Sequence, residues 1–169
     1  MAAKGAPDPA KRVIERLTQA NATLATAESC TGGLIAGALT DVPGASAAFY
    51  GGYVVYDNAA KTRMIKVPAR LIHDYGAVSN QVARAMADGA RNTAHTDYAV
   101  AVTGIAGPDG GSEKKPVGLV YLAVSTHDGT KVIERRFGDL GRDGIRKAAV
   151  AEALALTLYV LENGTDDGD

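Results

Sequence analysis

The stretch T-L-A-T-A-E-S-C-T-G-G-L-I-A-G-A-L-T, residues 23–40, sets the fold class of the chain. Residues 23–27 predict a short buried strand, and a Ser-Cys-Thr-Gly-Gly turn follows at residues 29–33. An apolar pattern at helical spacing then runs through Leu39. Strand, turn and helix in this order build α/β sheets, whose ligands bind beyond the carboxyl ends of the strands. The stretch therefore predicts an α/β fold with a candidate site at its turn.

Further helices are predicted on both sides of this stretch. The last one covers about residues 143–161. The others begin at N-capping residues or at proline. These start signals are Asp8 before Pro9, Asp57 or Asn58 before the segment that carries Lys61, Pro68, and Ser79.

Four more segments have the composition of strands. Residues 49–56 are rich in aromatic and β-branched side chains, and residues 98–102 are apolar. Residues 117–125 and 131–137 alternate and are joined by an Asp-Gly turn at 128–129, which is a hairpin signal.

The order of these elements predicts one domain. Early strands alternate with helices and a hairpin comes late, so we expect a three-layer α/β/α sandwich whose mixed β-sheet is covered by helices on both faces. A length of 169 residues fits a single domain. We place this domain at residues 10–163, between a flexible N-terminal tail at 1–9 and an acidic tail at 164–169.

Composition narrows the classes of partner. The net charge is -1 without a basic block, which disfavours nucleic-acid binding. No apolar run approaches the roughly 20 residues of a membrane span. Cys30 is the single cysteine, which fits a cytoplasmic protein, and no Cys/His spacing suggests a metal site. We therefore expect that the protein binds no membrane, metal or cofactor, and composition leaves open whether it forms a homo-oligomer.

The first candidate cluster is the turn at residues 29–33. Ser29 would be an exposed nucleophile, and helix N-terminal N–H groups nearby favour anionic oxygens. The alternative, which spacing alone favours, is that Ser29 or Thr31 caps the helix and Gly32 and Gly33 permit close packing. Cys30 is a rival nucleophile, although a lone cysteine beside a turn is more often a small buried residue.

The second cluster is Y-D-N-A-A-K, residues 56–61. A serine hydroxyl needs a base to act as a nucleophile near neutral pH, and a lysine serves if burial lowers its pKa. Lys61 is the candidate base, and Tyr56 would relay a proton or orient the lysine side chain. The alternative is a surface lysine beside a core tyrosine.

Two further clusters follow the third strand and open the last helix. The glycine-rich loop begins T-G-I-A-G at residues 103–107, and its backbone N–H groups can approach a ligand closely. It is not an ATP-binding P-loop, because it lacks the Gly-Lys-Ser/Thr ending. Arg142 and Arg146 are four residues apart on one helix face and could hold one phosphate. The alternatives are a mobile loop and a solvated face with Asp143 as N-cap.

Together these runs resemble the nicotinamide-nucleotide amidohydrolase family, known as PncC. The same domain forms the C-terminal part of CinA, a competence/damage-inducible protein. The resemblance covers about residues 13–161. It is carried by five runs in the same order: T-A-E-S-C-T-G-G, Y-D-N-A-A-K, H-D-Y-G-A-V-S, T-G-I-A-G-P-D-G-G-S-E-K-K-P-V-G and G-R-D-G-I-R.

The resemblance implies an α/β/α fold and hydrolysis of nicotinamide mononucleotide to nicotinate mononucleotide and ammonia, without metal or cofactor. Ser29 matches the nucleophile, Lys61 its base and Tyr56 a proton-transferring tyrosine. The implied ligand-binding residues are those of the two loops and one arginine of the last helix: Thr31, Gly32, Gly33, Thr103, Gly104, Ile105, Ala106, Gly107, and Arg142 or Arg146.

Under this hypothesis Lys61 accepts the Ser29 proton as Ser29 attacks the carboxamide carbon. Backbone N–H groups of the turn at residues 29–33 stabilise the oxyanion. Water then cleaves the acyl-enzyme. Two alternatives remain: a non-catalytic nucleotide-binding or partner-binding module, and an amidase for another small amide.

Overall fold

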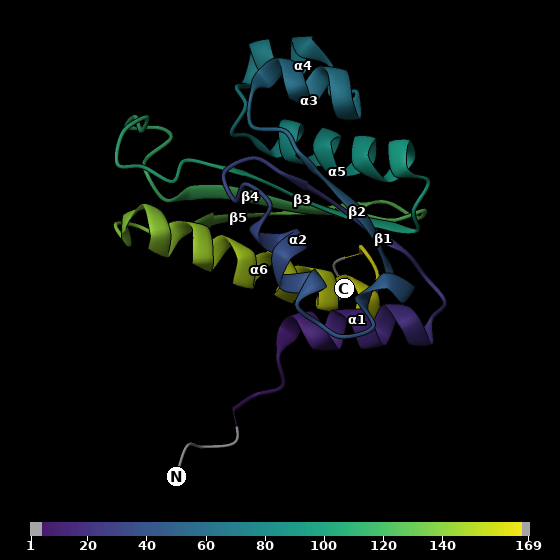
Figure 1. Ribbon diagram of the computed structural model, residues 1–169. Coiled ribbons are helices and arrows are strands. Elements are labelled where there is room, and N and C mark those ends of the chain that lie inside the picture. Colours follow the sequence, from purple (N-terminus) through teal and green to yellow (C-terminus); the bar gives the residue numbers. More distant parts are fainter. Residues whose placement is uncertain (1–4, 167–169) are drawn as a thin grey trace.

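Within residues 5–166, five strands form one mixed sheet in the order β2-β1-β3-β4-β5 (Figure 1). The structure, a computed structural model, describes residues 5–166. β1 pairs in parallel with β2 and β3, whereas β4 is antiparallel to β3 and β5. The strands are β1 Leu24–Glu28, β2 Phe49–Val54, β3 Tyr98–Gly104, β4 Leu119–Ser125 and β5 Thr130–Arg136.

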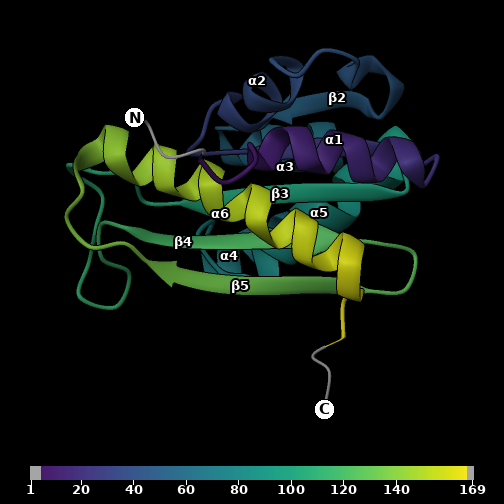
Figure 2. The same cartoon turned by 90° about the horizontal axis from the view of Figure 1, so that it is seen from below.

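Helices cover both faces of this sheet, as Figures 1 and 2 show, and this confirms the predicted α/β/α sandwich. α1, α2 and α6 lie on one face, and α3, α4 and α5 lie on the other. The helices are α1 Pro9–Gln19, α2 Leu34–Thr40, α3 Asn58–Ile65, α4 Ala69–Tyr75, α5 Asn80–Ala94 and α6 Gly141–Asn163, with a 3-10 turn at Ala45–Ala47.

The strand residues divide between two cores because successive side chains of a strand point to opposite faces. On β1, Leu24 joins the core under α1, α2 and α6, while Ala25 and Ala27 join the core under α3 and α5. All five residues of β1 are buried, as expected of a central strand whose two faces are both covered.

Close packing of α3 on α5 depends on a glycine. A Cβ atom on Gly89 of α5 would lie 1.8 Å from the carbonyl oxygen of Ile65 at the end of α3. Because no side chain fits in that gap, the two helices approach each other directly. This contact fixes the height of α3 above the sheet, and α3 carries Lys61.

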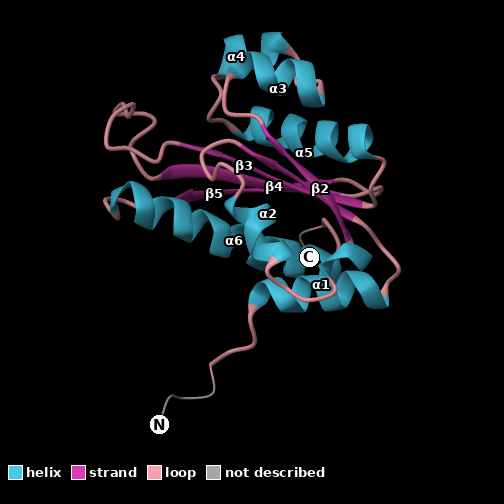
Figure 3. Ribbon diagram, viewed as in Figure 1, coloured by secondary structure: helices cyan, strands magenta, loops and turns pink. Residues whose placement is uncertain are grey.

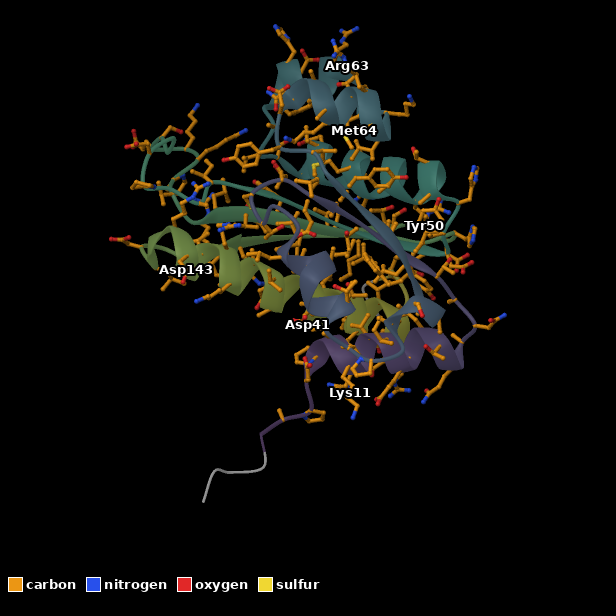
Figure 4. The ribbon with its side chains drawn as sticks, viewed as in Figure 1. Lys11, Asp41, Tyr50, Arg63, Met64 and Asp143 are labelled. Carbon is orange, nitrogen blue, oxygen red and sulfur yellow. The ribbon has the colours of Figure 1, made fainter. Side chains whose placement is uncertain are left out.

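The predicted helix starts are largely confirmed. Asp8, Asp57 and Ser79 accept hydrogen bonds from backbone N–H groups at the starts of α1, α3 and α5. The prediction for α6 is wrong at its start: the helix begins at Gly141 without a side-chain cap. Asp143 lies in its first turn (Figure 4) and pairs with Lys147 at 2.7 Å instead of capping.

The expected tails lie partly outside the described residues, which exclude 1–4 and 167–169. Pro9, expected in the N-terminal tail, is already the first residue of α1, with Asp8 as its cap. α6 reaches Asn163, so the expected acidic tail starts where the helix ends. Among the helices within residues 5–166, none combines the length and apolar character that a membrane crossing requires.

Candidate active site

The carboxyl ends of the three parallel strands meet at one edge of the sheet, where loops gather (Figure 3). Ser29 follows β1, Tyr56 lies just beyond β2, and Thr103 is near the end of β3. These residues line a cavity of about 180 Å³. Its full lining is Ser29, Cys30, Tyr56, Asn58, Lys61, Ala77, Val78, Thr103, Gly104, Ala106 and Arg142.

Ser29 and Lys61 are hydrogen-bonded in this cavity. The Nζ atom of Lys61 lies 3.1 Å from Ser29 Oγ and 3.1 Å from the backbone carbonyl oxygen of Tyr56. Ser29 is itself fixed by its backbone, whose N–H donates to the carbonyl of Val102 on β3 at 3.0 Å. The two side chains therefore meet at hydrogen-bond distance in the cavity, the distance that a proton transfer between them would require.

Lys61 is buried, so its interpretation as a surface lysine is wrong. Its side chain is 1% exposed, among the largest fully buried side chains of the described residues. Burial lowers the pKa of Lys61 below its ordinary value, against the opposing effects of Asp57 and Cys30. A lowered pKa increases the neutral fraction of the amine, which is the form that can accept a proton.

Cys30 has the opposite electrostatic character. Burial raises the pKa of its thiol to about 11, and the charge of Glu28 adds to this rise. The thiol is therefore neutral near pH 7, and a neutral thiol is a poor nucleophile. Although Cys30 lines the cavity next to Ser29, its environment does not activate it.

Tyr56 is not a core tyrosine. Its side chain is 62% exposed, and its hydroxyl accepts a hydrogen bond from Arg142 Nη2 at 3.3 Å. The contact between Tyr56 and Lys61 is made by the backbone carbonyl of Tyr56, not by the hydroxyl. The structure thus supports an orienting contact through the backbone, and it places the phenol at the cavity rim.

The two arginines of α6 make different contacts. Arg142 lines the cavity, and its Nη1 donates to the carbonyl of Gly107 at 2.7 Å. Arg146 is not part of the lining. It donates to the carbonyls of Cys30 at 3.0 Å and Thr31 at 3.4 Å, which ties α6 to the turn after Ser29. Of the pair, only Arg142 lines the cavity.

The glycine-rich loop contributes part of its predicted set to the cavity. Thr103, Gly104 and Ala106 line it, whereas Ile105 and Gly107 do not. The N–H of Ile105 is used by the carbonyl of Leu119. The hydroxyl of Thr103 donates to the carbonyl of Ala77 at 2.8 Å and so joins the loop to the segment before α5.

Two expectations for the turn at residues 29–33 are wrong. Ser29, expected to be exposed, is buried, with an exposed fraction of 8%. Neither Ser29 nor Thr31 caps α2: Gly33 is the N-cap, at φ 105°, and no side chain of the cap residue bonds the helix. Thr31, Gly32 and Gly33 do not line the cavity, and the Thr31 side chain is buried. Its hydroxyl instead donates to Glu28 Oε1 at 2.6 Å.

Several residues around the cavity were missed by reasoning from sequence. Glu28 is buried beneath the turn, and Asn58, Ala77 and Val78 line the cavity. A carboxylate directly after a strand predicted to be buried was the available signal for Glu28. Ala77 and Val78 offered no chemical signal, and Asn58 was considered only as a helix cap. Within residues 5–166, no group of three or more His, Cys, Asp or Glu side chains is arranged to hold a metal ion.

Comparison with known protein families gives one consistent result. The sequence profile described as the CinA C-terminal domain matches residues 7–161. A CinA-like protein of Synechococcus sp. (strain RCC307) is 52% identical over 145 residues, which are 85% of this chain and 35% of that protein. A CinA-like protein of Geobacter sulfurreducens is 58% identical over 132 residues, 78% of this chain and 32% of that protein. The chain thus spans about a third of these relatives.

Solved structures of similar sequence have the same fold. The competence/damage inducible protein CihA from Agrobacterium tumefaciens superposes with a TM-score of 0.89 at 46% identity, covering 96% of this chain and 100% of that chain. A competence-damaged protein (CinA) superfamily protein from Escherichia coli gives a TM-score of 0.85 at 31% identity, covering 94% and 95%.

Proposed function

The chain belongs to the CinA family, and on that premise we propose that it hydrolyses nicotinamide mononucleotide to nicotinate mononucleotide and ammonia. The family name alone does not specify this reaction. The proposal rests on the resemblance of the five sequence runs to the PncC amidohydrolases, together with the chemistry of the cavity. Because the chain spans about a third of its curated relatives, the proposal concerns the activity of this domain.

The observation that carries the proposal is the hydrogen bond between Lys61 Nζ and Ser29 Oγ, 3.1 Å long and buried. In the proposed mechanism the neutral amine of Lys61 accepts the hydroxyl proton while Ser29 Oγ forms a bond to the carboxamide carbon. The carbonyl of Tyr56 keeps the amine directed at Ser29, since it accepts a second hydrogen bond from the same nitrogen.

The oxyanion of the tetrahedral intermediate needs N–H donors. Ser29, Gly32 and Leu34 already donate their backbone N–H groups to carbonyls of Val102, Ser29 and Thr31. We assign the oxyanion to the backbone N–H of Cys30, because Cys30 directly follows the nucleophile and lines the cavity, whereas Thr31 and Gly33 do not line it. Removing one donor of this kind typically costs roughly 3–4 kcal/mol of barrier.

Collapse of the intermediate breaks the bond between carbon and nitrogen, and the protonated Lys61 returns its proton to the departing amide nitrogen, which leaves as ammonia. Tyr56, whose hydroxyl lies at the rim, is the candidate for assisting this transfer. Water then attacks the acyl-enzyme with Lys61 again as base, which releases nicotinate mononucleotide and restores Ser29.

A cavity of about 180 Å³ suits the pyridine ring with its carboxamide and leaves the ribose phosphate at the rim. Arg142 lies there, between the Gly107 carbonyl and the Tyr56 hydroxyl. Its guanidinium can offer paired N–H donors to phosphate oxygens. We propose Arg142 as the phosphate-binding residue, because it lines the cavity and Arg146 does not.

The test is ammonia release by the purified chain with nicotinamide mononucleotide, nicotinamide riboside and nicotinamide. We expect turnover of the nucleotide with a higher kcat/KM than either smaller amide, and none with Ser29→Ala. Cys30→Ala should keep most of the activity. Equal rates on all three amides would indicate an amidase for another small substrate. Binding of the nucleotide without ammonia release would indicate a non-catalytic module.

A further inference from the structure

Glu28 is a buried carboxylate with three hydrogen-bond donors around it. It is 1% exposed. Its Oε1 accepts from the Thr31 hydroxyl at 2.6 Å and from the N–H of Ile35 at 2.8 Å, and its Oε2 accepts from the N–H of Ala36 at 3.1 Å. Both oxygens are therefore occupied by groups on the far side of the turn that Ser29 begins. Nothing in the proposed chemistry uses this residue.

The contacts of Glu28 cap α2 from outside the helix. The first N–H groups of a helix have no partners within it, and a negative charge there is favourable. Here the last residue of β1 provides that charge, where an N-cap side chain would usually accept the bonds. The carboxylate thereby joins the end of β1 to the start of α2, across the turn at residues 29–33.

The turn is held by hydrogen bonds within it and around it: the N–H of Gly32 donates to the carbonyl of Ser29, and Arg146 donates to two carbonyls of the turn. Gly32 and Gly33 both have positive φ values, 59° and 105°. Glycine adopts such conformations freely, so the turn has alternatives that other residues would not allow. On the strand side it is held by the N–H of Ser29, which donates to Val102. On the helix side the Thr31 hydroxyl and its bond to Glu28 hold it.

We infer that Glu28 is a positioning residue: through Thr31 and the start of α2 it holds the turn that presents Ser29 to Lys61. This inference rests on the proposed function, because it assigns Glu28 to the alignment of that nucleophile. Alignment matters since displacement of a reacting group by about 1 Å can reduce a rate about a hundredfold.

A direct acid–base role for Glu28 does not fit the structure. Glu28 does not line the cavity. The shift of the Lys61 pKa comes from burial, with opposing effects of Asp57 and Cys30, and Glu28 is not among its causes. A positioning role therefore predicts that variants lose kcat while KM and the pH dependence of the rate stay as in the wild type.

The experiment compares Thr31→Val, Thr31→Ser and Glu28→Gln in the full chain. Thr31→Val removes the hydroxyl and keeps the shape of the side chain, while Thr31→Ser keeps the hydroxyl. We expect Thr31→Val and Glu28→Gln to lower kcat between about tenfold and a hundredfold. KM should stay within about twofold of the wild-type value, as should kcat of Thr31→Ser. Circular dichroism and thermal melting check that each variant is folded.

A second measurement is independent of the substrate. Amide hydrogen exchange over residues 29–36 should be faster in Thr31→Val and Glu28→Gln than in the wild type and in Thr31→Ser. Labelling of Ser29 by a fluorophosphonate probe should slow in the same two variants. A folded Thr31→Val protein with wild-type kcat and wild-type exchange would overturn the inference. So would a shifted pH profile in Glu28→Gln, because it would mean that Glu28 acts on the ionisation itself.

The two proposals fail in different ways. If the wild type releases no ammonia from nicotinamide mononucleotide, the proposed function is wrong, and hydrogen exchange and Ser29 labelling still decide the role of Glu28. If the wild type is active and exchange over residues 29–36 does not change in the variants, the proposed function stands and the positioning role is wrong.

Discussion

At the scale of single residues, the site depends on the environment of one amine. Lys61 is buried between its helix and the sheet, with Ser29 Oγ and the Tyr56 carbonyl as its two hydrogen-bond partners. An ordinary lysine has a pKa of about 10.4 and is almost fully charged at pH 7. Burial lowers the pKa of Lys61, which moves the neutral form towards the working range.

The first prediction is that kcat/KM rises with pH along a single ionisation below the ordinary range of lysine. The base must be neutral, so activity is low below the lowered pKa and reaches a plateau above it. Lys61→Arg keeps the positive charge but cannot deprotonate in this range, and we expect a loss on the order of 10²–10⁴ in kcat/KM. Rates across pH for both proteins provide the check. A folded Arg variant with a near-wild-type rate would show that Lys61 acts only by its charge.

At the scale of elements, the first turn and a half of α6 serves two parts of the site. The loop between β3 and β4 lies at the same end of the molecule as this turn (Figures 1 and 3). Arg142 crosses to that loop and to Tyr56, while Arg146, one helical turn later, holds the carbonyls of Cys30 and Thr31. A single helix therefore joins the rim of the cavity to the turn that carries the nucleophile.

Because the two arginines contact different parts of the site, the same substitution at each should change a different kinetic constant. Arg142→Met should mainly raise KM for nicotinamide mononucleotide, and it should leave the much weaker activity on the riboside nearly unchanged. Arg146→Met should mainly lower kcat for both, because it loosens the turn and touches no phosphate. Each effect should be on the order of tenfold to a hundredfold. Steady-state kinetics of both variants on the nucleotide and the riboside test this prediction. If Arg146→Met raised KM and Arg142→Met lowered kcat, Arg146 would be the phosphate-binding residue and Arg142 the one that holds the turn.

At the scale of the whole molecule, the buried charge of Lys61 lowers the stability of the folded chain. A buried lysine with a lowered pKa binds its proton less strongly in the folded chain than in the unfolded chain. Stability therefore rises with pH between the folded pKa and the unfolded value of about 10.4, because the unfolded state binds more protons there. Below the folded pKa the full cost of the buried charge remains.

We accordingly predict that Lys61→Met is inactive but more stable than the wild type at neutral pH. Methionine fills the space with an apolar chain and removes the buried charge. The difference in Tm between the two proteins should shrink as the pH rises towards 10, where the wild-type lysine is neutral in the fold. Thermal melts at several pH values test this. A constant difference in Tm across that range would mean that the Lys61 ionisation does not contribute.

The features that depend on near neighbours along the chain could be predicted from the sequence. The caps of α1, α3 and α5 are confirmed because Asp8, Asp57 and Ser79 bond N–H groups two or three positions away. The α/β/α sandwich could also be predicted, because strand and helix patterns are local in the sequence and the order of the elements allows few ways of connecting them in one sheet. The residue types that could serve as nucleophile and base were also visible, at Ser29 and Lys61.

The burial and the hydrogen-bond partners of those residues depend on contacts between distant parts of the chain. Ser29 and Lys61 are 32 positions apart, and Arg146 reaches Cys30 across 116 positions. Only the folded chain shows that Lys61 is buried and that Glu28 caps α2 in place of Ser29 or Thr31. Burial and long-range hydrogen bonds set these properties, and both depend on how β1, α2, α3 and α6 pack together. No pattern within one segment of the chain carries that information.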